Sequence, residues 1–472
     1  MAGELPDDLR RELTRHRQEH VLRLWDKLGP ASRQRLLEQI QALDLGQLEA
    51  LVATRQKTGA AEQDALVERS RRAVPPQSMV RLPQTADERN RWEQARAAGD
   101  GLLRAGKVGA ILVAGGQGTR LGFDKPKGVY PIGALSGAPL FQILAQQLLA
   151  RSRRAGAPIP YFIMTSDATH DETVAFFAEH NNFGLPAGDV FFFQQGNMPA
   201  VDAESGKLLI AGDQTLSTSP DGHGGMLTAL AKSGLLAEMN RRGIEYLHYH
   251  QVDNPTAIVC DPVFLGFHAE LGCDMSVKVV AKRSAAERMG VAVDVDGVTQ
   301  IIEYSDLPLD VARKTDAAGA LLLWAGSTAI HVFTRAFLDR LVDHGDALPF
   351  HVAHKKVPYC NADGKLINPE RENAYKFERF IFDALPLATR ARVLETDRAR
   401  EFNPVKNASG DDSPETARAA LASLFHGWLR AAGAQIDDAT PVEISPLFAL
   451  DVEDVRAKVK PGTKFSEPTF LN

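Results

Sequence analysis

The pattern of hydrophobic and polar positions is helical over roughly the first hundred residues. Between residues 5 and 55, apolar side chains such as Leu9 and Leu13 recur four positions apart with charged residues between them, which predicts short amphipathic helices. Gly29-Pro30 interrupts this pattern, and Ser32 is the predicted N-cap of a second helix. Polar residues and prolines at 56–90 indicate a connector, and residues 92–103 predict another helix.

From residue 105 to about 385, strand-like apolar runs alternate with helical patterns. Strands are predicted at 108–113, 161–164, 190–193, 246–252, 275–281, 291–295, 298–304, 321–324 and 328–333. Helices are predicted at 140–150, 173–180 and 226–240, and Asp296-Gly297 predicts a two-residue hairpin turn. This order predicts an α/β fold with a mainly parallel sheet, helices on both faces, and ligands at the carboxyl ends of the strands.

After residue 385 the pattern changes again. A loop at 401–407 precedes a helix predicted from Ser413 to Ala432, with Ser413 as its cap and Pro414 in its first turn. Residues 439–472 predict short strands and turns. We therefore expect three consecutive parts: a helical N-terminal segment with its connector (1–104), a central α/β domain (105–385) and a small α+β domain (386–472).

The most informative stretch joins the first central strand to a glycine-rich loop. The strand 108–113 is followed by three glycines and two cations: Gly115, Gly116, Gly118, Arg120 and Lys127. Glycines let a ligand approach the backbone closely, and successive exposed N–H groups form an anion-binding concavity. The loop and its cations predict a phosphate-binding site.

The spacing of this loop excludes two common phosphate motifs. A P-loop requires Lys followed by Ser or Thr after the glycines, and that pair is absent here. The dinucleotide fingerprint has a third glycine where this chain has Leu121, with Gly122 one position late. The alternative interpretation is a glycine-rich loop that follows a strand and binds no ligand. The two cations Arg120 and Lys127 argue against it.

Three further strand ends and loops carry candidate ligand contacts. Gln195 follows a strand and can donate to and accept from the edge of a uracil ring, although a glutamine satisfied within a turn explains the pattern equally well. The loop 219–225 contains Gly222 and precedes a helix, so its backbone is expected near a base or phosphate; His223 in this loop is not assigned as a general base. Asp253 ends the strand 246–252 and is a candidate Mg²⁺ ligand, the alternative being a carboxylate that caps the next turn.

Composition limits the classes of function. The 472-residue chain has 44% hydrophobic and 24% charged residues and a net charge of -6, which argues against non-specific binding to nucleic acid. The three cysteines lack metal-ligand spacing, and no apolar stretch approaches the ~20 residues of a membrane span. The charged start lacks the apolar core of a signal peptide, so we expect a cytoplasmic protein without a membrane partner.

The run AGGQGTRLGFDKPKG at 114–128 resembles the nucleotide-binding motif of the uridylyltransferases that make UDP-sugars. The chain is most similar to the eukaryotic-type UDP-N-acetylhexosamine pyrophosphorylases, and the similarity covers nearly its whole length. The chain also matches further blocks of the family in the same order. These are QQG at 194–196, Pro-Asp-Gly at 220–222, Val-Asp-Asn at 252–254, Gly290-Val291, the strand with Glu303, and the segments around Lys376 and Lys406.

This resemblance implies a Rossmann-like (GT-A-type) nucleotidyltransferase core with smaller N- and C-terminal domains. It implies that the uridine nucleotide is held by Val113, Ala114, Gly115, Gly116, Gln195 and Gly222. Arg120, Lys127 and Lys376 are expected to face the phosphates as catalytic residues, and Asp253 to bind Mg²⁺. Glu303 and Lys406 are expected to face the sugar phosphate. His223, Asn254, Gly290 and Ser327 are also expected to line the substrate site.

The implied reaction converts UTP and N-acetylglucosamine 1-phosphate into UDP-N-acetylglucosamine and pyrophosphate by in-line attack on the α-phosphate. The chain departs from the family where the hexosamine enzymes carry Asn-Ala-Gly-Asn, because it has Trp324, Ala325, Gly326 and Ser327. His223 also replaces an Asn and is more like the UDP-glucose and broad UDP-sugar enzymes. A UDP-glucose, UDP-galactose or broad-specificity pyrophosphorylase is therefore the alternative. A glycosyltransferase and a UDP-sugar sensor are rivals from other classes.

Overall fold

The computed structural model describes residues 5–213, 215–343 and 348–472, with the side chains of 58–63 left out. The chain divides into two compact units that interleave in sequence. Unit 1 comprises Met1–Glu68, Gln195–Met226 and Leu348–Asp383, and unit 2 comprises Arg69–Gln194, Leu227–Ala347 and Ala384–Asn472. This division does not coincide with the three consecutive parts expected from the sequence.

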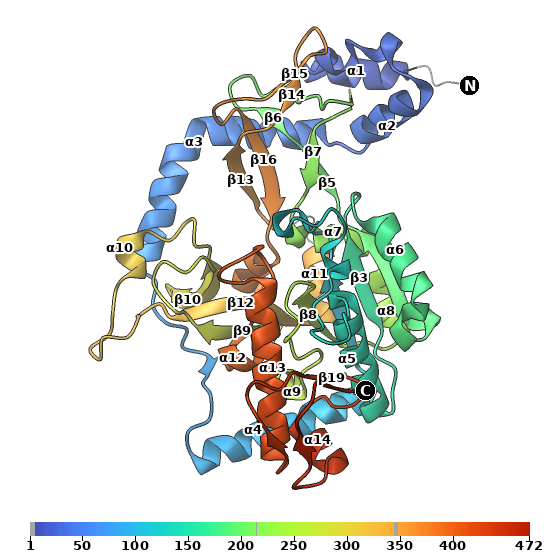
Figure 1. Cartoon of the computed structure of the whole chain (residues 1–472). Helices are drawn as coiled ribbons and strands as arrows, with labels where there is room; N and C mark the ends of the chain where they lie inside the picture. The colour runs from blue at the N-terminus through green and yellow to red at the C-terminus, as the bar shows by residue number, and fades with distance from the viewer. Residues whose placement is uncertain (1–4, 214, 344–347) are drawn as a thin grey trace. The chain divides into compact units, whose positions relative to one another are not determined.

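Unit 2 is built on a large mixed sheet (Figure 1). Its strands follow the order β1 (Met79–Val80), β17 (Ala391–Glu395), β9 (Met275–Ala281), β12 (Ala325–Thr334), β8 (Tyr246–Gln251), β2 (Val108–Val113), β3 (Tyr161–Thr165) and β4 (Val190–Gln194). Neighbouring strands are parallel except β12, which runs antiparallel to both β8 and β9. The predicted mainly parallel α/β sheet is confirmed, whereas residues 321–324 form a turn ahead of β12 and not the predicted strand.

The predicted hairpin is also confirmed. β10 (Val291–Val295) and β11 (Val298–Ile302) pair antiparallel, and β10 also pairs with the start of β12. The turn residues Asp296 and Gly297 have φ of 52° and 82°, the left-handed values that a type I′ hairpin turn requires.

Helices of unit 2 pack on this sheet. They are α4 (Ala86–Arg104), α5 (Leu140–Ala155), α6 (His170–Glu179), α7 (Met226–Lys232), α8 (Leu235–Arg241), α9 (Pro262–Glu270), α10 (Leu309–Ala312) and α11 (Arg335–Asp343). The helix predicted at 226–240 is two helices, α7 and α8, separated at Gly234, whose φ is 72°. The sequence did not predict α9, which crosses α4 so closely that a Cβ on Gly99 would lie 1.9 Å from the Pro262 carbonyl oxygen.

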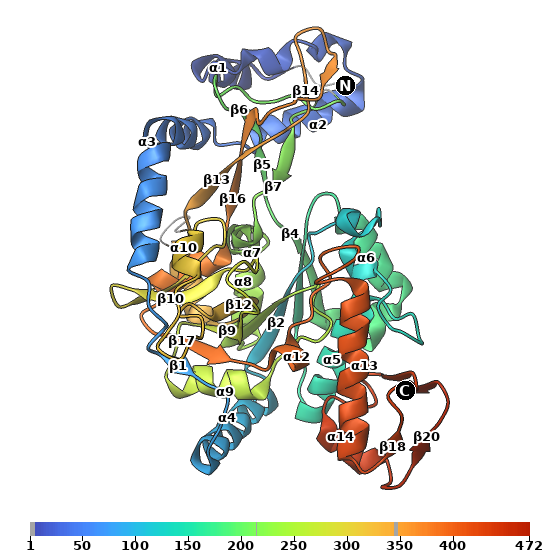
Figure 2. The same cartoon turned by 60° about the vertical axis from the view of Figure 1, so that its left-hand side comes forward.

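The C-terminal segment of unit 2 adds α12 (Arg398–Glu401), α13 (Pro414–Ala431), α14 (Val452–Lys458) and the strand pairs β18 (Gln435–Ile436) with β20 (Lys464–Phe465) and β19 (Val442–Ile444) with β21 (Thr469–Leu471). Ser413 caps α13 through Thr416, as predicted. α13 lies alongside α5 in both views (Figures 1 and 2), and Leu421 and Leu429 share the hydrophobic core of the sheet.

In unit 1, α1 (Asp7–Arg15), α2 (Pro30–Gln41) and the first part of α3 (Leu45–Arg71) pack on strands contributed by the two later segments. These strands are β5 (Asn197–Pro199), β6 (Val201–Asp202), β7 (Thr218–Pro220), β13 (Phe350–Lys355), β14 (Tyr359–Cys360), β15 (Leu366–Ile367) and β16 (Ala374–Arg379). The apolar side chains of the helices share one core with Val201, Leu208 and Phe377. This shared core explains why the later segments group with the N-terminal helices and not with the main sheet.

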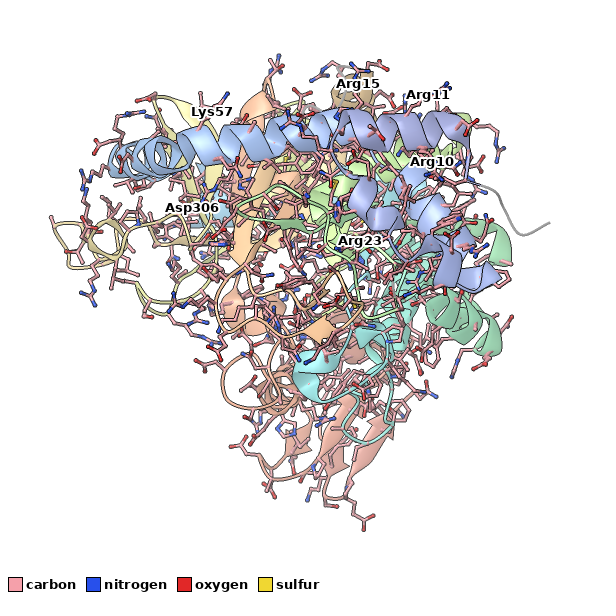
Figure 3. The ribbon with its side chains drawn as sticks, turned by 90° about the horizontal axis from the view of Figure 1, so that it is seen from above. Arg10, Arg11, Arg15, Arg23, Lys57 and Asp306 are labelled. Carbon is pink, nitrogen blue, oxygen red and sulfur yellow. The ribbon has the colours of Figure 1, made fainter. Side chains whose placement is uncertain are left out.

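The helices of unit 1 are amphipathic, as predicted. In α1, Leu9 and Leu13 are buried, while Arg10, Arg11 and Arg15 are exposed and labelled in Figure 3. The prediction that Ser32 caps α2 is wrong: the helix begins at Pro30, with Gly29 as N-cap, because proline has the φ of a first helical turn. The expected connector at 56–90 is also shorter, since α3 continues to Arg71 and α4 begins at Ala86, where Thr85 and Glu88 form a capping box. No helix of the described residues is long and apolar enough to cross a membrane.

Candidate functional site

The glycine-rich loop begins where β2 leaves the centre of the main sheet. The Ala114 N–H donates to the Met164 carbonyl at 2.7 Å, and Ser166 Oγ donates to the Gly115 carbonyl at 2.8 Å, so β3 holds the start of the loop. A Cβ added to Gly116 would meet no atom within 4 Å. The backbone that follows Val113 therefore borders open space at the carboxyl end of a parallel sheet, where ligands of α/β proteins bind.

Backbone hydrogen bonds then fold the loop back on itself. The Gly118 N–H donates to the Lys125 carbonyl at 2.9 Å, and the Lys127 N–H donates to the Gly116 carbonyl at 3.0 Å. Glycine is required at position 118, because a Cβ there would lie 2.7 Å from the Phe123 carbonyl oxygen. The fold of the loop returns Lys127 to the point where the loop began.

Asp253 lies beside this loop on the neighbouring strand. β8 pairs with β2 in parallel, and the Val252 N–H donates to the Val113 carbonyl at 3.1 Å, so Asp253 follows at the same edge of the sheet. Lys127 Nζ lies 3.5 Å from Asp253 Oδ2, and the two side chains are 17% and 13% exposed. The structure thus brings two of the predicted site residues into an ion pair. Arg120, on a short helical turn in the loop, has an exposed side chain.

Lys406 is brought to the same edge from the C-terminal segment. The Val405 N–H donates to the Asp253 carbonyl at 2.7 Å, and the Lys406 N–H donates to the Asp412 carbonyl at 2.7 Å. Lys406 Nζ lies 5.5 Å from the centre of the Phe402 ring. The backbone of this segment therefore lies against Asp253, one residue before Lys406.

Asn254 ties these segments together. Its Nδ2 donates to the Glu401 carbonyl at 2.8 Å, and its Oδ1 accepts from Thr256 Oγ1 at 3.0 Å and from the Asn403 N–H at 3.2 Å. The side chain is buried. In this structure the amide positions the loop that carries Lys406, and its expected contact with substrate stays a prediction.

A buried charged cluster that the sequence pattern does not reveal lies behind this edge. Lys278 on β9 is 1% exposed, and its Nζ lies 2.6 Å from Asp261 Oδ2 and 2.5 Å from Glu401 Oε1. Burial alone would raise the pKa of Asp261, but the Lys278 ammonium outweighs it, and the pKa lies below its ordinary value. Glu401 Oε1 also accepts from the Ile258 N–H at 3.2 Å. The available signal was a lone lysine within the apolar strand 275–281.

Gly290, Glu303 and Ser327 come together around the hairpin. The Ser327 N–H donates to the Gly290 carbonyl at 2.8 Å, and a Cβ on Gly290 would lie 3.1 Å from Glu303 Oε2. Ser327 Oγ accepts from the Ala329 N–H at 3.3 Å, where β12 contains a bulge and Ala329 has φ of 56°. The three residues predicted to bind substrate thus form one group.

The orientation of Trp324, which the sequence did not determine, is visible in the structure. The guanidinium carbon of Arg81 lies 4.1 Å from the centre of the indole ring. Arg81 Nε is in turn bound to Glu395 Oε2 at 2.6 Å. The Arg81 guanidinium, which is bound to Glu395 at the β1–β17 edge of the sheet, therefore covers one face of the Trp324 ring.

Gln195 and Gly222 lie in unit 1. The backbone of Asp221 joins the segments that carry them. The Asp221 N–H donates to the Gly196 carbonyl at 2.9 Å, and the Arg379 N–H donates to the Asp221 carbonyl at 2.8 Å. Gly222 has φ of 84°, and a Cβ there would lie 2.4 Å from the Arg379 carbonyl oxygen. Glycine is therefore obligatory at 222.

His223 has a structural role in this loop. Its Nδ1 accepts from the Ile381 N–H at 3.1 Å, and its ring packs against Phe380 and Phe382 with centroids 5.4 and 5.7 Å away. Desolvation, followed by the charge of His351, lowers the pKa of His223 to about 4. A ring with so low a pKa is a weak base, and its Nδ1 lone pair is already bound to the Ile381 N–H, so His223 is poorly suited to act as a general base.

Lys376 lies on β16, opposite Ala353 of β13. Because side chains alternate along a strand, Lys376 and Glu378 share the face opposite to Tyr375 and Phe377, which contact the N-terminal core. The same strand continues to Arg379, whose backbone lies against Gly222. Within unit 1, Lys376 therefore stands on the strand that packs against the predicted uridine loop.

The donor set around Asp253 fits Mg²⁺ bound together with a phosphate. Among the described residues no group of three or more His, Cys, Asp or Glu side chains could hold a metal ion. Mg²⁺, however, needs only one or two carboxylates when phosphate oxygens and water complete its coordination. A partly exposed carboxylate next to a phosphate-binding loop meets that requirement.

Known proteins resemble this chain over most of its length. Residues 51–455 match the family model described as UTP–glucose-1-phosphate uridylyltransferase. Human UDP-N-acetylhexosamine pyrophosphorylase-like protein 1 is 36% identical over 505 residues, covering 100% of this chain and 98% of that protein. The UDP-N-acetylglucosamine pyrophosphorylase of Saccharomyces cerevisiae is 40% identical over 350 residues, covering 72% and 73%. The solved uridine diphosphate N-acetylglucosamine pyrophosphorylase of Trypanosoma brucei matches with a TM-score of 0.82 and 26% identity, covering 96% of this chain and 95% of that one.

Proposed function

Because the chain belongs to the UTP–glucose-1-phosphate uridylyltransferase family, it is a uridylyltransferase, and we propose that it makes UDP-N-acetylglucosamine and pyrophosphate from UTP and N-acetylglucosamine 1-phosphate. The reaction is reversible. In this proposal the main sheet is a Rossmann-like (GT-A-type) nucleotidyltransferase core, and the protein acts in the cytoplasm.

The ion pair between Lys127 and Asp253 carries this proposal. A cation and a carboxylate lie 3.5 Å apart at the carboxyl ends of two adjacent parallel strands, beside a glycine loop with open space at Gly116. A nucleoside triphosphate requires such a combination of backbone N–H groups, cationic side chains and a metal-binding carboxylate.

The chemistry requires no general base in the protein. A phosphate monoester has a second pKa of about 6, so the sugar phosphate is largely ionised near pH 7. One of its oxygens forms a bond to the α-phosphorus of UTP while the bond from that phosphorus to the bridging oxygen breaks. The electron pair leaves with pyrophosphate. The low pKa of His223 and its bond to Ile381 are consistent with this scheme.

The side chains of the site act by positioning and by neutralising charge. Arg120 and Lys127 bind the triphosphate, and Lys376 stabilises the transferred phosphate in the transition state. Lys406 and Glu303 orient the sugar phosphate. Gln195 and the Gly222 loop select uracil, and Asn254 holds the segment that carries Lys406.

Asp253 would hold Mg²⁺ in this proposal. The metal, when bound, would neutralise phosphate charge and polarise the α-phosphate. Lys127 Nζ lies 3.5 Å from Asp253 Oδ2 and provides a counter-charge for this carboxylate.

The test is pyrophosphorolysis. The protein is incubated with UDP-N-acetylglucosamine, pyrophosphate and MgCl₂, and UTP formation is followed. We expect UTP and N-acetylglucosamine 1-phosphate in equal amounts, and none without pyrophosphate. Sugar transfer or hydrolysis without consumption of pyrophosphate would indicate a glycosyltransferase, and binding without turnover would indicate a sensor.

A further inference from the structure

Unit 2 contains a second hollow, between α5, α13 and β19. The space in and around it that no atom fills amounts to about 960 Å³, open solvent included. Its apolar wall includes Ile143 of α5, Leu421, Phe425 and Trp428 of α13, and Ile444 of β19. The phosphate loop and its cations do not line it, so it is a separate site from the one described above.

A buried cation lines this hollow. Arg151 of α5 is 4% exposed, and among the described residues no hydrogen bond or ion pair joins its guanidinium to another group. Its buried Nε has no partner. Desolvation lowers the pKa of Arg151, yet a guanidinium holds its proton so strongly that the group stays charged near pH 7. An unpaired charge at this depth destabilises the fold unless something binds it.

The nearest carboxylates are already bound to other cations. The charges of Asp261 and Asp451 reach Arg151, but Asp261 is bound to Lys278 and Asp451 Oδ2 to Arg154 Nη1 at 2.6 Å. The acidic side chain in the wall of the hollow, Glu443, already accepts from the Leu135 N–H at 2.7 Å and from Ser136 Oγ at 2.5 Å. Three arginines, Arg151, Arg400 and Arg418, line the hollow together with this carboxylate, so positive charge is in excess there.

The remaining polar groups of the wall suit an anionic head. Gln142 and Gln146 of α5 also line the hollow, nine and five positions before Arg151, and both are half-buried. Arg400 lines it with an exposed side chain. A carboxylate, sulfonate or phosphate at Arg151 would have the aromatic side chains Phe425 and Trp428 in the same hollow to cover the rest of the ligand.

One wall of the hollow continues into the catalytic edge. Residues 255–258 line it and follow Asp253 and Asn254 directly. The Ile258 N–H donates to Glu401 Oε1 at 3.2 Å, in the residue after Arg400. A ligand in the hollow would therefore contact both backbone segments that hold Asp253 and Lys406.

We propose that this hollow is an effector site for an amphipathic organic anion, with an aromatic or aliphatic body packed against Phe425 and Trp428 and its anionic group bound by Arg151. The site goes beyond the proposed reaction, and its binding test does not depend on that reaction.

Binding is tested with two fluorescent probes of similar body, anilinonaphthalene sulfonate and uncharged N-phenylnaphthylamine, on the folded full chain. We expect the sulfonate to bind at least about tenfold more tightly, with energy transfer from Trp428 that a Trp428→Phe variant reduces. Arg151→Met should lower the affinity for the sulfonate probe by roughly tenfold and leave the affinity for the neutral probe unchanged. Arg151→Lys should restore part of the affinity for the sulfonate. Decanoate and phenyl phosphate as competitors distinguish a carboxylate ligand from a phosphate ligand.

Arg153→Met is the matched control, because Arg153 is exposed on the same helix. It should leave both affinities unchanged. Arg151→Met without ligand should melt at or above the wild-type temperature, since the change removes an unpaired buried charge. Equal affinities for the two probes, or sulfonate binding that survives Arg151→Met, would overturn the proposal. So would a ligand that binds through Arg151 but leaves the KM for sugar 1-phosphate and kcat unchanged, because no effector role would then exist.

Discussion

Lys127 Nζ and Asp253 Oδ2 lie 3.5 Å apart, although one residue belongs to the loop after β2 and the other follows β8. Their approach depends on two backbone contacts. The Lys127 N–H binds the Gly116 carbonyl, and the Val252 N–H binds the Val113 carbonyl. The parallel pairing of β2 with β8 thus places the candidate metal ligand against the candidate phosphate loop.

Replacing the carboxylate tests this arrangement. Asp253→Asn keeps the shape of the side chain but removes the charge proposed to hold Mg²⁺, so turnover should fall by about a hundredfold or more. The melting temperature should change little, because the side chain is near the surface of the site. Steady-state kinetics over a range of Mg²⁺ concentrations measure the effect, and near-normal turnover at saturating Mg²⁺ would contradict the assignment.

The lysines of the two units should affect different kinetic constants. Lys406→Ala should raise the KM for sugar 1-phosphate more than that for UTP, because Lys406 is proposed to face the sugar phosphate. Lys376→Ala should lower kcat at saturating substrates, since an interaction made mainly in the transition state affects the rate and not ground-state binding. Initial rates with each substrate varied in turn distinguish the two. The division would be wrong if both variants changed only the KM for UTP.

The sequence predicted the core of the fold for identifiable physical reasons. Strands such as 108–113 are short, apolar and β-branched, and Ser413-Pro414 is a local helix start, so local patterns sufficed there. The membership of unit 1 was not predictable in this way, because Leu208 and Phe377 contact the N-terminal helices from distant positions in the sequence. Long-range contacts leave no periodic pattern.

The same limit applies to the site. The glycines and Asp253 follow strands and were found by position, whereas Lys376 and Lys406 were assigned only through the family resemblance. Lys278 was missed because its partners, Asp261 and Glu401, lie 17 and 123 positions away. Only the folded chain shows that this lysine neutralises two buried carboxylates.

The Lys278 cluster should be a major source of stability. Lys278→Met leaves Asp261 and Glu401 buried without their cation, at a cost of about 3–5 kcal/mol, or a melting temperature lower by on the order of 10 °C. Lys107→Met is the control: it removes an exposed pair with Glu245 and should cost under about 1 kcal/mol. Thermal unfolding of both variants gives the comparison. If the triple variant Lys278→Met, Asp261→Asn, Glu401→Gln is no more stable than Lys278→Met alone, uncompensated charge is not the cause.

Buried histidines should make unit 2 sensitive to mild acid. Desolvation lowers the pKa of His250 and of His268 to about 3, the latter against a small opposing effect of Asp274. Between pH 6.5 and 3 the folded state keeps both rings neutral while the unfolded chain protonates them, so stability is lost as pH falls below 6.5. Each ring contributes a slope of roughly 1.4 kcal/mol per pH unit. His268→Gln should therefore flatten the melting temperature between pH 7 and 5, and an unchanged pH profile would contradict the prediction.

The sugar preference should depend on Ser327. Its backbone binds Gly290, and its hydroxyl accepts from Ala329 within the bulge, so little of this short side chain remains to recognise an acetamido group. The hexosamine enzymes are expected to carry Asn here, and one lost hydrogen bond costs roughly 1 kcal/mol, which corresponds to a fivefold to tenfold preference. We therefore expect N-acetylglucosamine 1-phosphate to be the better substrate, with measurable activity on glucose or galactose 1-phosphate.

Ser327→Asn should restore that factor and raise the preference for N-acetylglucosamine 1-phosphate by about five- to tenfold. The measurement is kcat/KM for the N-acetylglucosamine, N-acetylgalactosamine, glucose and galactose 1-phosphates, with Ala318→Asn in an exposed loop as the control. Exclusive use of glucose or galactose by the wild type would favour the alternative UDP-sugar pyrophosphorylase. If the wild type instead rejects both glucose and galactose 1-phosphate, Ser327 and Trp324 do not set the specificity, and other residues recognise the acetamido group.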